Sequence, residues 1–131
     1  MIDNLNIPLL FILIFHGIVF CQSGLDKIFN WKGNFDFTKE TLTDKFPSTI
    51  VNLALFIVLI LEILGGIFSV IGVFYLFIDS SCLLFSQIGL SLCSLALLIL
   101  MLGQRVSQNY ADAKSIAIYF IISIIGMTLV F

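Results

Sequence analysis

Four long runs with almost no charge constrain the fold of this chain more than any other feature. They cover residues 6–24, 49–78, 82–104 and 115–131, and Glu62 is the one charged residue within them. About 20 apolar residues in a helix cross the ~30 Å hydrocarbon core of a bilayer. Backbone polar groups in lipid must bond to one another, and the runs lack the alternation of a barrel strand. Each run therefore predicts a transmembrane helix.

The overall composition agrees with this interpretation. Hydrophobic residues make up 60% of the chain and charged residues 11%, against about 45–50% and about 25% in soluble domains. We predict an all-α fold, in which residues 1–131 form a single transmembrane domain, an antiparallel four-helix bundle in the lipid bilayer. A net charge of −2 without a basic run excludes a nucleic-acid partner.

The long connection, residues 25–48, predicts a short interfacial segment between the first two spans. It mixes aromatic residues with lysines, a combination typical of the headgroup level. Phe35, Leu42 and Phe46 fall at helical spacing, so residues 35–46 predict a short helix in the interface.

The basic residues predict the orientation of the chain. All six Lys and Arg lie in the loops at residues 25–48 and 105–114. The turn expected at Asp79-Ser80-Ser81 and both termini have none. The positive-inside rule then places both loops in the cytoplasm and both termini outside.

Two ionisable residues fall within the spans, His16 in the first and Glu62 in the second. Placing an ionisable side chain in lipid costs free energy, so such residues usually have a function or a polar partner. Their depths allow a His16–Glu62 contact between neighbouring helices. A proton relay, a quinone headgroup site and a structural interhelical hydrogen bond are the three interpretations. Gln87 and Ser91 on the third span complete this candidate intramembrane polar site, as helix-bonding groups or as a cavity lining.

A second candidate site lies at the cytoplasmic ends of the spans. Gly24 and the Asp26–Lys27 pair mark the expected end of the first helix in the hydrocarbon, and Arg105 could pair with Asp112, with Asp26 or with a lipid phosphate. The predicted cytoplasmic-side patch consists of Asp26, Lys27, Gln104, Arg105, Tyr110 and Asp112. These residues either anchor the protein in the membrane and lock the loops together, or form a binding patch.

Metal and thiol chemistry are not predicted. The chain has a single His, and its cysteines, at positions 21, 82 and 93, form no CxxC pair. Zinc sites require four clustered ligands. We predict no metal and no cofactor, with a quinone as the alternative ligand.

The ordered motifs of the chain resemble the DoxX family. The first span ends in SGLDKIFN, the second carries LEILGG, and the third ends in GQR followed by NYADA. The resemblance covers nearly the whole chain and looks like the DoxX-like proteins of Bacteroidota inner membranes. The positions that match the family pattern are Gly24, Lys27, Glu62, Gly65, Gly66, Gln104 and Arg105.

The resemblance implies a four-helix protein of the bacterial inner membrane. From it we expect a small accessory subunit of a larger, redox-linked membrane complex, with protein partners and no enzyme activity of its own. One alternative is a quinone-binding oxidoreductase subunit that uses His16 and Glu62, and another is a small-solute or proton carrier. The branch of the family with paired cysteines is not matched, so thiol transfer is not implied.

Overall fold

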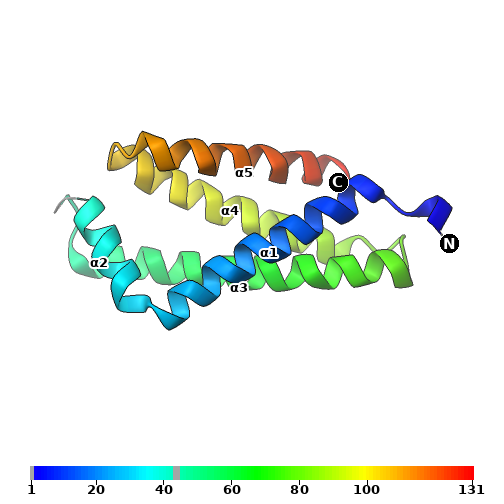
Figure 1. Cartoon of the computed structure of the whole chain (residues 1–131), viewed down its shortest axis with the longest axis horizontal. Helices are drawn as coiled ribbons and strands as arrows, with labels where there is room; N and C mark the ends of the chain where they lie inside the picture. The colour runs from blue at the N-terminus through cyan, green and yellow to red at the C-terminus, as the bar shows by residue number, and fades with distance from the viewer. Residues whose placement is uncertain (1, 43–44) are drawn as a thin grey trace.

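The computed structural model describes residues 2–42 and 45–131, and this part of the chain is helical without strands (Figure 1). The elements are η1 (Ile2–Asn4), α1 (Ile7–Phe29), α2 (Trp31–Thr41), α3 (Ser48–Ile78), α4 (Leu84–Val106) and α5 (Tyr110–Thr128). All of the α-helices except α2 are long and apolar enough to cross a membrane. The chain is therefore a multi-pass membrane protein.

Local capping fixes two of the helix starts. The Asn6 side chain accepts a hydrogen bond from the Leu9 backbone N–H at 3.1 Å, and proline stands in the first turn of α1. Asn109 does the same for α5 by accepting from the Asp112 N–H at 3.4 Å. Consequently α5 begins at Tyr110, five residues before the predicted span at 115, because a polar first turn is stabilised by its cap.

The helix over the first predicted span, residues 6–24, extends beyond Gly24. The helix continues to Phe29, so Asp26 and Lys27 lie within α1. Adjacent charges do not stop a helix when one of them finds a partner inside the protein, and Lys27 does so. The other predicted bounds differ from α3 and α4 by at most two residues.

The interfacial helix also starts earlier than predicted. Instead of 35–46, α2 begins at Trp31, whose ring meets Phe56 of α3 edge-on at a centroid distance of 6.5 Å. This aromatic contact holds the start of α2 on the bundle. Residues 43–44 of the predicted helix lie outside the described residues.

The predicted turn at 79–81 is confirmed. Asp79 follows the last residue of α3 and accepts from the Ser81 hydroxyl at 2.5 Å and from its backbone N–H at 3.1 Å. These two bonds favour the carboxylate and hold the pKa of Asp79 below its usual value.

Close helix packing centres on α3, which contacts both α1 and α4 extensively. A Cβ added to Gly65 would lie 2.7 Å from the Cys93 sulfur of α4, and one added to Gly66 would lie 2.7 Å from the Cys21 sulfur of α1. The two adjacent glycines therefore allow two different helices to approach the same turn of α3. Small residues at helix interfaces are the usual device for close packing in membranes.

Helix α1 stops short of the beginning of α3. Gly17 faces Val70 and Gly24 faces Ile63, so the last residue of α1 is roughly level with position 58. About ten residues of α3, or roughly 15 Å of helix, extend past this point. Figure 1 shows α2 at this end, opposite the end where both termini lie. The short α1 leaves a space that α2 covers.

Candidate functional site

A buried ion pair joins α1 to α3. The Lys27 Nζ lies 2.7 Å from Glu62 Oε2, and the two residues are 8% and 2% exposed. Ser23 completes a closed ring: its hydroxyl donates to Glu62 Oε1 at 3.1 Å and accepts from Lys27 Nζ at 2.9 Å. Ser23 and Lys27 are four residues apart on one helix face, so both reach the same carboxylate.

Helix geometry explains why Lys27 turns inward. It follows Gly24 by three residues, and Gly24 packs closely against Ile63 of α3. A lysine one turn further along the same face points at Glu62 rather than at the headgroups. The Lys27 side chain is therefore buried between α1 and α3. A carboxylate at the middle of an apolar helix attracts the nearest cation, because both charges are otherwise desolvated.

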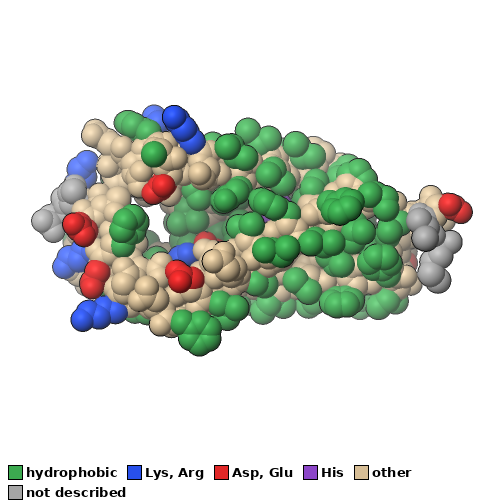
Figure 2. All heavy atoms as spheres, in the orientation of Figure 1, with side chains coloured by type: hydrophobic (Ala, Val, Ile, Leu, Met, Phe, Trp, Pro, Cys, Tyr) green, Lys and Arg blue, Asp and Glu red, His purple; other side chains and the backbone are tan. Residues whose placement is uncertain are grey.

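Next to this ion pair lies a cavity of about 240 Å³ at the loop end of the protein. All five α-helices contribute to its wall, and Lys27 lines it from the α1 side. Its apolar part comes from Leu55 and Val58 of α3 and from Ile99 and Leu100 of α4. The space-filling view shows a hollow at the charged end of the molecule (Figure 2).

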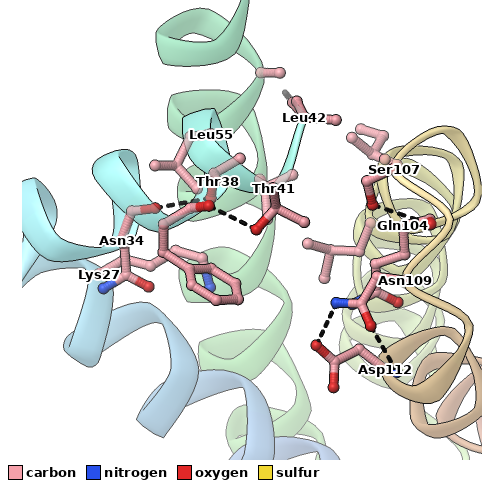
Figure 3. Close-up of a pocket in the computed structure, with 16 residues that line it drawn as sticks. Lys27, Asn34, Thr38, Thr41, Leu42, Leu55, Gln104, Ser107, Asn109 and Asp112 are labelled. Atoms are coloured by element: carbon pink, nitrogen blue, oxygen red, sulfur yellow. Dashed lines mark hydrogen bonds between the residues drawn. The ribbon is translucent and has the colours of Figure 1, made fainter. Parts of the chain in front are cut away.

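The polar part of the cavity wall comes from two segments that face each other (Figure 3). Asn34, Thr38 and Thr41 lie on α2, and the opposite side is formed by Gln104, Ser107, Asn109 and Asp112. The two threonine hydroxyls bond to backbone carbonyls of their own helix at 2.8 and 2.6 Å. The Asp112 carboxylate accepts from the Asn109 amide at 2.6 Å.

One buried polar atom of a wall residue lacks a hydrogen-bond partner. Gln104 Oε1 is buried and has no hydrogen-bond partner among the described residues. A buried acceptor without a partner costs about 1–3 kcal/mol. This oxygen has essentially no accessible surface, so it is enclosed by the protein and is not open to the cavity.

The predicted contact between His16 and Glu62 is wrong. Nδ1 of His16 lies 2.8 Å from the Ile12 carbonyl oxygen, and Nε2 lies 2.6 Å from the Ser123 hydroxyl of α5. Each carboxylate oxygen of Glu62 is held by Ser23 or Lys27. His16 and Glu62 separate because each finds a partner on a different neighbouring helix. His16 thus joins α1 to α5, and Glu62 joins α3 to α1.

The two α4 members of the predicted intramembrane site do not join His16 or Glu62 either. Gln87 donates to the Val130 carbonyl at 2.6 Å, close to the chain end. Ser91 is half-buried on α4. Ser94, also on α4, donates to the Leu90 carbonyl of its own helix and lies 3.4 Å from the Met127 sulfur of α5. Bonding within and between helices therefore explains the polar residues of α4 better than a shared site with His16 or Glu62.

The predicted cytoplasmic-side patch is brought together only in part. Lys27, Gln104 and Asp112 line the cavity. Arg105 instead stacks its guanidinium on the Tyr110 ring at 4.8 Å.

The predicted Arg105–acid pairs are replaced by amide contacts. Asp112 bonds Asn109, and Asp26 accepts from the Asn34 amide at 3.2 Å. The Tyr110 ring, next to the end of α4, gives the guanidinium of Arg105 a cation–π partner instead.

Sequence reasoning missed Ser23 and the polar face of α2. The spacing of Ser23 and Lys27 was a usable signal for the first, since residues four apart share a helix face. Asn34, Thr38 and Thr41 also recur at helical spacing. Their role was hidden because the predicted helix started too late to include Asn34.

Comparison of the chain with models of protein families, with curated proteins and with solved structures finds no match in any of the three. The likeness to the DoxX family stays a prediction that rests on the motifs quoted above.

Proposed function

We propose that the chain is an antiparallel four-helix protein of the bacterial inner membrane that binds one small amphipathic molecule in the cavity between α2 and the ends of α4 and α5. The observation that carries this proposal is the cavity itself, because apolar side chains of α3 and α4, polar side chains of α2 and α5 and the buried Lys27 all line it. Concave sites with a few placed polar groups among apolar side chains are typical of ligand binding. The order of facing residues on α1 and α3 supports the antiparallel arrangement.

The ion pair adds support of a different kind. A buried pair is often no more stabilising than apolar side chains of the same volume. Ionisable residues inside the membrane are costly and are usually tied to function. Lys27 is both paired and in contact with the cavity, so it supplies a charged donor where a ligand would bind.

Two roles predicted from the sequence remain proposals alongside this one. Membership of a redox-linked complex as an accessory subunit is compatible with a ligand-binding cavity. A quinone is one amphipathic molecule that the cavity could hold. His16 and Glu62 do not form a joint site, so a quinone would bind in the cavity next to Lys27.

Purification in mild detergent from the native membrane tests both the binding of a ligand in the cavity and the accessory-subunit role. We expect a stoichiometric small molecule in the organic extract, and its loss in Ala54→Trp, which adds a large ring at the cavity wall. Leu53→Trp is the matched control, since Leu53 is the neighbouring residue and is 57% exposed on the outside of α3. Equal occupancy in both variants would contradict the cavity as the site. Absence of co-purified protein partners would count against the accessory role.

We also propose that the two loops face the cytoplasm and the termini the outside. The three cysteines provide a test, because Cys82 lies beside the 79–81 turn whereas Cys21 and Cys93 lie inside α1 and α4. A membrane-impermeant maleimide added to right-side-out vesicles should label the wild type and not Cys82→Ser. Labelling of Cys82 only in inside-out vesicles would contradict this orientation and favour the opposite one.

A further inference from the structure

The cavity has an open side between α3 and α4, formed by Ala54, Ile99 and Gly103. All three residues line the cavity, yet Ala54 is also exposed on the outside of α3. A Cβ added to Gly103 would meet no described atom within 4 Å, whereas one added to Gly65 or Gly89, at the α3–α4 contact, would lie 2.7 Å from a neighbour. No tight helix contact therefore closes the flank of α4 at Gly103. We call this opening the lateral entrance.

Helix geometry shows which way the lateral entrance faces. Residues nine positions apart are two and a half turns apart, so they lie on opposite sides of a helix. Ile63 of α3 faces α1, and Ala54 precedes it by nine positions. Ser94 of α4 contacts α5, and Gly103 follows it by nine positions. The lateral entrance therefore faces away from α1 and α5, toward the outer face of the α3–α4 pair.

The surface around the lateral entrance is apolar. Large aliphatic side chains next to Ala54 and Gly103 are exposed, namely Ile50, Leu53 and Ile57 on α3 and Leu102 on α4. Contiguous exposed apolar surface of this kind marks contact with a membrane. An apolar path therefore leads from the bilayer to the aliphatic wall of the cavity.

The interior of the cavity can hold a hydrocarbon chain. Leu55, Val58 and Leu100 line it next to the entrance residues in sequence, and the volume is about 240 Å³. An apolar cavity of about 150 Å³ in a protein stays dry and takes up a small hydrocarbon. A chain in the aliphatic part restores the dispersion contacts that an empty space lacks. Lys27 and Asn109, on the α1 and α5 sides, lie across the cavity from the entrance and leave the polar part for a head group.

We propose that the cavity takes its ligand from the bilayer, as an amphiphile whose single hydrocarbon chain passes between α3 and α4 through the lateral entrance. The head group then lies toward Lys27 and Asn109. This inference rests on the proposed function and assigns the class of its ligand and the route of entry. The small side chains of Ala54 and Gly103 leave room for one chain where it enters.

Photolabelling of the full chain in phosphatidylcholine vesicles tests the inference whatever the natural head group is. The probes are a lysophosphatidylcholine and a phosphatidylcholine, each with a diazirine on one acyl chain, and peptide mass spectrometry locates the labelled residues. We expect the single-chain probe to label Leu55 or Val58 inside the cavity as well as the outward-facing Leu53 and Leu102. The two-chain probe should label the outward-facing residues alone. Interior labelling by the two-chain probe at equal or higher yield overturns the single-chain class.

Gly103→Phe tests the route, because the added ring occupies the open space at the lateral entrance. Interior labelling should be lost in this variant, and labelling of Leu53 should remain. Leu102→Phe is the matched control, since it creates the same side chain one position away at a residue that is 66% exposed and does not line the cavity. Ile99→Trp, at the same entrance, provides a second variant if Gly103→Phe does not fold.

The remaining outcomes separate this inference from the proposed function. Interior labelling that persists in Gly103→Phe and Ile99→Trp overturns the lateral entrance. Labelling of outward-facing residues alone in the wild type, together with a co-purified molecule that is lost in Ala54→Trp, overturns entry from the bilayer and keeps the cavity as a binding site. Absence of both interior labelling and a co-purified molecule overturns both proposals.

Discussion

Replacing Lys27 with methionine should destabilise the protein by about 3–5 kcal/mol, the usual effect of leaving one partner of a buried ion pair alone. Glu62 is 2% exposed and would keep only the Ser23 hydroxyl as a partner. The measurement is the thermal unfolding midpoint in a single detergent, followed by circular dichroism.

The double variant Lys27→Met/Glu62→Leu is the control for this result. It removes both charges together, and its stability should return to within about 1 kcal/mol of the wild type or exceed it. A single variant as stable as the double variant would mean that Glu62 does not depend on Lys27. The same double variant should lose ligand binding, because the donor at the cavity is gone.

Gly89→Ala should also destabilise the protein, by about 1–3 kcal/mol, because it overpacks the contact between α3 and α4. The added methyl would lie 2.7 Å from the Ser69 backbone nitrogen and 2.8 Å from its hydroxyl oxygen. A backbone atom of a long helix cannot move aside alone, so the two helices would have to separate. Thermal unfolding again provides the measurement.

Gly103→Ala is the matched control for Gly89→Ala on the same helix. An added Cβ at Gly103 meets nothing within 4 Å. Alanine is a better helix former than glycine by about 0.8–1 kcal/mol, so this variant should be as stable as the wild type or more stable. Equal midpoints for the two alanine variants would show that the close approach at Gly89 does not limit the packing.

The membrane-spanning helices could be predicted because hydropathy acts locally. Each apolar run must be helical in lipid whatever its neighbours are, and the structure has a helix long and apolar enough to span a membrane over each of the four runs. The ends of the helices were harder to predict. Whether Lys27 ends α1 or extends it depends on a carboxylate 35 positions later in the chain.

The partners of the polar residues could not be predicted for the same reason. His16 and Glu62 have compatible depths, but depth does not specify the rotation of each helix about its axis. In the folded bundle His16 is directed at Ser123 of α5, and Glu62 is directed at Lys27 of α1. The rotation of each helix that produces these pairs follows from the close packing at Gly65 and Gly66. The cavity was likewise hidden, since it arises from the unequal lengths of α1 and α3.

The pairing of Lys27 with Glu62 has a consequence for how the protein is made. The lysine is synthesised first, near the end of a helix, where its long side chain can extend to the headgroups until a partner arrives. The carboxylate enters later, at the middle of a 31-residue apolar helix. The many aliphatic side chains of this helix outweigh the insertion penalty of one charged residue, which is roughly 2.5–3.5 kcal/mol for Asp, Lys or Arg. When the newly inserted α3 docks against α1, Lys27 and Glu62 pair and neutralise each other. Correct assembly of the first two spans is therefore the step that removes these charges from the lipid.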